Sequence, residues 1–139
     1  MIICKECGIN EAVGSYRIKC EICREKHTNL KKFKQSVRNL INISFRKRGY
    51  KKNLSTEIIL GCSFLEFKLY IESNFEPWMN WENKSKFNGN IKTGWDLDHI
   101  RPISSAKTID DVIELNHYTN YQPLCSYINR FVKKNKSVV

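Results

Sequence analysis

The chain has 139 residues, a formal net charge of +10 at pH 7 and a hydrophobic share of 41%. This length suits one compact unit with a small appendage, and the hydrophobic share is normal for a soluble protein. No apolar run is long enough to cross a membrane and no targeting segment is present, which favours a cytoplasmic protein without a membrane partner.

Four cysteines near the start form two Cys-x-x-Cys pairs, namely Cys4 with Cys7 and Cys20 with Cys23. Four thiolates at this spacing can close a tetrahedral zinc site without an open position, which is typical of structural zinc. Two disulfides would imply secretion, yet no signal peptide is present, and a redox Cys-x-x-Cys does not usually come in pairs. We therefore predict a zinc knuckle over residues 1–27, with Gly8 in its tight turn and His27 as a substitute ligand.

Positive charge is concentrated in residues 24–52, which hold eleven Lys or Arg and one acidic residue, whereas the flanking segments are each balanced. Solvated charged faces are common, but such a concentration is the footprint expected for phosphate contacts. We expect double-stranded DNA as the partner. The predicted DNA contacts, including some in the basic tail, are Lys31, Lys34, Arg38, Arg46, Lys47, Arg48, Lys51, Lys52, Arg130, Lys133 and Lys134.

The basic segment also has helical periodicity. Apolar residues at helical spacing over residues 30–45 predict a helix from about Thr28 to Arg48, whose apolar stripe packs inward while its basic face stays free. Thr28 or Asn29 can cap the start, and Gly49 marks the stop.

Three further helices are predicted along the chain. Ser63 and Glu66 form a capping-box pattern that begins a helix ending near Asn74. A shorter helix runs from Thr108 to about Leu115, with acidic residues in its first turn. A last helix runs from about Ser126 into the lysines. Its side chains expected to face mostly inward are Tyr127, Ile128, Phe131 and Val132.

An aromatic cluster precedes and enters the C-terminal half, comprising Phe75, Trp78, Trp81, Phe87 and Trp95. These rings suit either a base-stacking platform or a packed core. Packing around strands is the favoured interpretation. Cys62 and Cys125 are most simply buried thiols.

Asp98, His99, Asn120 and Asn129 have the residue types that phosphodiester hydrolysis requires. Asp98 and Asn129 offer oxygen ligands to a divalent ion such as Mg²⁺, and the imidazole of His99 can take a proton from water near neutral pH. Adjacent residues of a strand point to opposite faces, so Asp98 and His99 share one site only if the strand bends or ends there. Pro102 fits such an end.

The amide of Asn120 can bond backbone groups and hold the histidine in place. Asn116 and His117 compete with Asn120 for this role.

The Asp98-His99 pair, Asn120 before Leu124-Cys125, and Asn129 followed by lysines resemble the HNH family of endonucleases. Residues 75–83 and 60–63 also resemble the accessory region of phage-encoded members, so the likeness covers roughly residues 30–136. The resemblance implies a ββα-metal fold, two strands packed on a helix. It also implies Asp98 and Asn129 as ligands of Mg²⁺ or Mn²⁺, His99 as general base and Asn120 as the residue that orients the active-site loop.

Two departures from the family pattern are visible. Many members hold a structural zinc near the site, but its second cysteine pair falls here at Cys125 and Ile128, and Ile128 cannot bind zinc. The third motif position is Asn129 instead of His, which makes an HNN variant and leaves the metal preference open.

We therefore predict an α+β protein with a zinc knuckle at 1–27, a basic helical DNA-binding region at 28–76 and an HNH core at 77–139. We expect a metal-dependent DNA endonuclease, with no small-molecule cofactor, in the host cytoplasm if a phage encodes it. One site has one nucleophile, so a monomer is expected to nick one strand, although the oligomeric state is open. The alternatives are a non-catalytic DNA-binding or regulatory protein on the same scaffold and a protein that binds or cleaves RNA.

Overall fold

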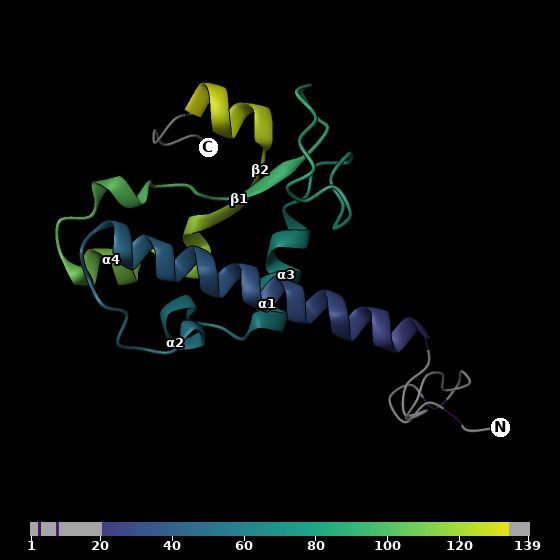
Figure 1. The fold of residues 1–139 in the computed structure, drawn as a ribbon, viewed down its shortest axis with the longest axis horizontal. Coiled ribbons are helices and arrows are strands. Elements are labelled where there is room, and N and C mark those ends of the chain that lie inside the picture. Colours follow the sequence, from purple (N-terminus) through teal and green to yellow (C-terminus); the bar gives the residue numbers. More distant parts are fainter. Residues whose placement is uncertain (1–2, 4–7, 9–20, 134–139) are drawn as a thin grey trace. The chain divides into compact units, whose positions relative to one another are not determined.

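The computed structural model describes residues 3, 8 and 21–133, without the side chains of residues 21–25, 27 and 28. The chain divides into two compact units, residues 1–37 and 38–139. The second unit combines helices with a small antiparallel sheet, which is an α+β arrangement (Figure 1).

The basic segment forms the long helix α1 (Glu21–Lys47), which begins seven residues earlier than predicted. Thr28 and Asn29 therefore lie inside the helix and do not cap it. The residues before them include no glycine or proline, so nothing in the sequence interrupts the helix there. The end agrees with the prediction, since Gly49 follows with a left-handed φ of 80°. Ile41 and Phe45, both from the predicted stripe, are buried.

Two helices follow, each capped by a serine. The short helix α2 (Thr56–Leu60) begins after Ser55 and ends at Gly61, whose φ is 79°. Periodicity does not reveal α2 because five residues are too few to show a helical repeat. The helix α3 (Phe64–Ser73) begins as predicted, where the hydroxyl of Ser63 accepts a hydrogen bond from the Glu66 amide at 3.1 Å.

The sheet consists of β1 (Trp95–His99) and β2 (Tyr121–Cys125), paired antiparallel. Their register places Asp98 opposite Gln122 and His99 opposite Tyr121. The connection contains η1 (Ile103–Ser105), α4 (Ile109–Leu115) and η2 (Tyr118–Asn120). The predicted end of the first strand at the Asp-His pair is confirmed.

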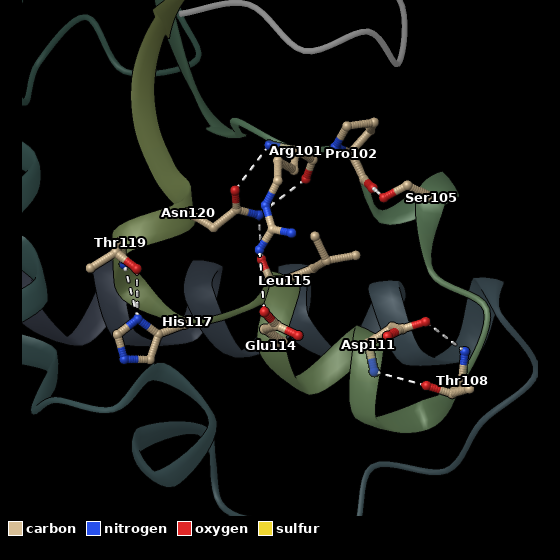
Figure 2. Close-up of polar contacts among 10 residues, drawn as sticks. All are labelled: Arg101, Pro102, Ser105, Thr108, Asp111, Glu114, Leu115, His117, Thr119 and Asn120. Atoms are coloured by element: carbon tan, nitrogen blue, oxygen red, sulfur yellow. Dashed lines mark hydrogen bonds and ion pairs between the residues drawn. The ribbon is translucent and has the colours of Figure 1, made fainter.

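The helix α4 has the predicted start. The hydroxyl of Thr108 accepts a hydrogen bond from the Asp111 amide, and the Asp111 carboxylate accepts one from the Thr108 amide (Figure 2). This reciprocal capping box satisfies free amide groups of the first turn. It therefore fixes the residue at which α4 begins.

Aromatic side chains form much of the core beside the sheet. Trp95 is fully buried and contacts the rings of Phe75 and Trp81 at centroid distances of 5.0 and 5.4 Å. On the second strand, Tyr121 packs edge-on against Phe67 of α3. The packing interpretation of the aromatic cluster is confirmed for Phe75, Trp81 and Trp95.

The last described helix corrects the prediction for its inward side chains. The chain is helical from Ser126, but over η3 (Ile128–Lys133) it forms a π-helix, whose i→i+5 hydrogen bonds wind it more loosely than an α-helix. Phe131 and Val132, predicted to face inward, are more than half exposed, and Tyr127 is 38% exposed. Lys133 is the buried residue instead, with 2% exposure.

None of the helices in the described part of the chain combines the length and apolar character needed to cross a membrane.

Candidate active site

Three of the four predicted site residues line one cavity of the second unit. This cavity of about 350 Å³ is lined by Asp98 and His99 at the end of β1 and by Asn129 of η3. Lys47 and Arg48, at the end of α1, line it as well. The end of a strand, the end of a basic helix and the start of a π-helix therefore converge on one polar hollow.

Asp98 holds a cation in this cavity. Its carboxylate, 8% exposed, forms an ion pair with the ammonium of Lys133, with 2.5 Å between Nζ and Oδ2. The same ammonium donates to the backbone carbonyl of His99, and Gln122 on the opposite strand donates to Asp98 Oδ2 at 3.1 Å. Asp98 is thus a buried carboxylate whose negative charge is compensated by one internal cation.

A second carboxylate, Asp96, lies two residues earlier on β1 and anchors η3. Its oxygens accept hydrogen bonds from Ser126, from Asn129 Nδ2 at 3.0 Å and from both Nε and Nη2 of Arg130. Burial alone would raise the pKa of Asp96, but these hydrogen bonds, first among them that from Arg130, outweigh it and hold the pKa below its usual value. Asp96 stays ionised near neutral pH and positions Asn129.

His99 is held by a buried amide. Its Nε2 lies 2.8 Å from Asn116 Oδ1, and its ring packs at 4.4 Å on the ring of Tyr121. Burial lowers the pKa of His99, while the hydrogen bond to Asn116 and the charge of Asp98 oppose this shift only in part. The imidazole is therefore neutral at pH 7, the form that a general base requires.

Asn120 joins the segment after His99 to the rest of the connection. Its Oδ1 accepts a hydrogen bond from the Arg101 amide at 2.9 Å, and its Nδ2 donates to the carbonyls of Arg101 and Leu115 (Figure 2). The backbone carbonyl of Asn120 also accepts from the Ile100 amide. These bonds are of the kind expected of a residue that orients the loop beyond His99. Asn120 does not line the cavity.

The two competitors for that position have different surroundings. Asn116, at the end of α4, is fully buried and bonds to His99 itself. His117 bonds to Thr119 (Figure 2) and does not line the cavity. The amide that touches the imidazole is therefore Asn116, while Asn120 acts on the backbone that follows.

The predicted DNA contacts fall into three groups. Exposed side chains of the described chain are Lys31, Arg38, Arg46, Lys47, Arg48 and Lys51, and those of Lys34 and Lys52 are half-buried. Arg130 is partly exposed but bonded to Asp96. Lys133 is buried against Asp98, which corrects its assignment as a surface contact, because a buried carboxylate attracts the nearest cation. Lys134 lies outside the described residues.

Sequence reasoning missed Asp96, Lys133 in its inward role, and the partners of Asn116. Asp96 could have been predicted from the sequence, because side chains at positions i and i+2 of a strand lie on the same face of the sheet. This spacing places Asp96 and Asp98 together. The contacts of Lys133 and Asn116 join segments far apart in the chain and leave no local pattern.

The predicted structural zinc site lies largely outside the described residues. This applies to Cys4, Cys7 and Cys20, while Cys23 lies in the first turn of α1 without a described side chain. Gly8 has a φ of 68°, as a tight turn requires. Of the other two cysteines, Cys125 is buried as predicted and Cys62 is half-buried. Burial and nearby Glu66 and Glu57 raise the pKa of the Cys62 thiol to about 11.

Asp98 and Asn129 both line the cavity and carry oxygen atoms of the kind that bind Mg²⁺ or Mn²⁺. Within the described residues, no cluster of three or more His, Cys, Asp or Glu side chains could hold a metal, so such an ion would depend on few protein ligands, on amide oxygen and on water. The carboxylate of Asp98 is already paired with the ammonium of Lys133, with which an ion at Asp98 would compete. The amide nitrogen of Asn129 donates to Asp96, which leaves the carbonyl oxygen as its ligand atom.

Comparison with protein-family models gives no match for this chain, and comparisons with curated proteins and with solved structures give none either. The functional proposal therefore depends on the cavity and on the order of Asp98, His99, Asn120 and Asn129 along the chain.

Proposed function

We propose that this protein is a metal-dependent DNA endonuclease of the HNH type, with a ββα-metal core made of β1, β2 and η3. The observation that carries the proposal is the cavity that Asp98, His99 and Asn129 line together with Lys47 and Arg48. A neutral base, oxygen ligands and phosphate-binding cations are the groups that phosphodiester hydrolysis requires.

In the proposed mechanism each side chain has one task. Neutral His99 takes a proton from a water molecule, which then attacks phosphorus in line with the departing 3′-oxygen. Asp98 and Asn129 would hold Mg²⁺ or Mn²⁺, which when bound supplies charge stabilisation to the phosphate and the leaving oxygen. Lys47 and Arg48 bind phosphates beside the cavity, and Asn120 keeps the loop after His99 in place. The four N-terminal cysteines would hold structural Zn²⁺.

The first test is cleavage of supercoiled plasmid by the wild-type chain with Mg²⁺ or Mn²⁺ and with a chelator control. We expect metal-dependent conversion of supercoiled to nicked plasmid, because one cavity supplies one nucleophile and a monomer cuts one strand at a time. Sedimentation in the same buffer gives the oligomeric state. Clean double-strand breaks by a strictly monomeric protein, without a nicked intermediate, would contradict the nicking mechanism. A parallel digestion of structured RNA separates DNA from RNA cleavage.

The basic face predicts a strong dependence of DNA binding on salt. If about six cations contact phosphates, the logarithm of the affinity should fall with the logarithm of the salt concentration at a slope of about −5. Arg46→Gln and Lys47→Gln should each reduce this slope by about 0.9. Lys86→Gln, at an exposed lysine outside the predicted contacts, is the matched control. A slope near zero, or equal effects of all three substitutions, would contradict the assigned face.

One observation favours a second candidate, a non-catalytic DNA-binding or regulatory protein on the same scaffold. The ammonium of Lys133 compensates the charge of Asp98, so this carboxylate is stable without a metal ion. Such a protein would bind DNA with the same salt slope but would leave plasmid intact with either metal.

A further inference from the structure

The side chain of Asn116 can adopt only one orientation in the core. Its Nδ2 lies 2.9 Å from the carbonyl oxygen of Val112, which can only accept a hydrogen bond. Its Nδ2 also lies 2.8 Å from the hydroxyl of Ser44, whose own proton is donated to the carbonyl of Ile41. Both neighbours therefore accept, and the nitrogen of the amide must face them.

The orientation of this amide determines which nitrogen of His99 carries the proton. Since Nδ2 faces Val112 and Ser44, the atom that faces His99 is Oδ1, which cannot donate. Oδ1 also accepts from the hydroxyl of Tyr121 at 2.6 Å. His99 Nε2 must then be the donor, and in the neutral ring the lone pair lies on Nδ1.

We propose that Asn116 is a positioning residue that holds His99 in its Nε2–H tautomer and so makes Nδ1 the nitrogen that accepts the proton. The cavity, the buried amide and its four partners carry this inference, and its catalytic meaning rests on the proposed nuclease function. Asn116 itself is fully buried and does not line the cavity. It acts through His99 and not on the substrate.

The tautomer can be read directly by nitrogen-15 NMR correlation spectra of the histidine rings at about pH 8, where the ring is neutral. The chain has three histidines, and His27→Gln and His117→Gln assign the signals of His99. In the wild-type chain we expect the Nε2–H form. In Asn116→Leu the proton at Nε2 would face a hydrocarbon, so we expect the Nδ1–H form to become the larger population. A wild-type Nδ1–H form, or an unchanged tautomer in folded Asn116→Leu, would overturn the proposal.

Tyr121→Phe is the matched control. It removes the other donor to Asn116 Oδ1 but leaves the hydrogen bond from His99, so the tautomer should stay Nε2–H. For nicking, we expect Asn116→Leu to lower kcat by about 10²- to 10⁴-fold with little change in KM, since the base is in the wrong tautomer.

The two measurements separate the inference from the function on which it rests. The NMR result needs no activity, so an Asn116-dependent tautomer in a protein that never nicks DNA would contradict the nuclease proposal and leave the positioning role intact. Metal-dependent nicking by a protein whose His99 tautomer does not depend on Asn116 would support the nuclease proposal and contradict the positioning role. If Asn116→Leu does not fold, as judged by circular dichroism, a wild-type Nδ1–H form would still overturn the inference.

Discussion

Replacement of His99 with alanine should lower the rate of metal-dependent plasmid nicking by about 10²- to 10⁴-fold, the usual cost of removing a general base. The reason is local, because the neutral imidazole at the cavity is the group with a pKa suited to accept the proton of the attacking water. The measurement is the initial rate of supercoiled-plasmid loss at saturating metal, together with DNA affinity from a fluorescence titration. DNA affinity should change little, since the lysines and arginines that we propose as phosphate contacts are untouched.

His117→Gln is the matched control for this experiment, as it changes a histidine outside the cavity. Its nicking rate should stay close to that of the wild-type chain. Equal rates for His99→Ala and the wild-type chain would remove His99 from the mechanism. An equal loss in both variants would point to damage of the fold, which circular dichroism would detect.

Lys133→Met should destabilise the metal-free protein by about 3 kcal/mol or more, because it leaves the buried carboxylate of Asp98 without a compensating charge. Divalent ions should then restore stability. A ligand whose concentration is about 100 times its dissociation constant raises the free energy of unfolding by about 2.7 kcal/mol. The measurement is urea unfolding with and without Mg²⁺ or Mn²⁺. The wild-type chain should respond less to the ion, because the ion has to displace the ammonium first.

Two further variants make this result specific. Arg130→Met removes the cation of a more exposed pair with Asp96, so it should cost less than about 1 kcal/mol and leave the metal response unchanged. The double variant Lys133→Met with Asp98→Asn should recover stability and lose most of the metal response. If Lys133→Met were as stable as the wild-type chain and insensitive to metal, Asp98 would not be the cation site.

The two experiments address different parts of the proposal. His99→Ala tests the proton transfer, whereas Lys133→Met tests whether the cavity binds a cation at Asp98, without reference to catalysis. A protein that binds metal at Asp98 but does not nick DNA would support the binding or regulatory alternative. Loss of both properties would leave the salt-dependent DNA binding as the remaining function.

Local signals in the sequence predicted much of the fold. The caps at Ser63 and Thr108, the stop at Gly49 and the end of the strand at His99 are all found where the sequence placed them. Each depends on hydrogen bonds or backbone preferences within about four residues. The start of α1 was predicted too late, because apolar periodicity over residues 30–45 shows where a helix packs and not where it begins.

The candidate site was predicted in part. Asp98, His99 and Asn129 line one cavity, and Asn120 bonds the backbone after His99. The inward position of Lys133 was not predicted, because it depends on a π-helical turn that apolar periodicity at α-helical spacing does not describe. The contact of Asn116 with His99 was not predicted, because it joins residues 17 positions apart.

The sequence by itself determined which reactive and charged side chains the chain contains and in what order. It also determined where the capped helices begin and where the strand with the Asp98-His99 pair ends. Only the tertiary structure decided which groups meet. The bond from Asn116 to His99 spans 17 residues, that to Ser44 spans 72, and the pair of Lys133 with Asp98 spans 35. Contacts at such separations depend on how the packed core brings strands and helices together, and buried charges and amides then take the partners that lie within reach.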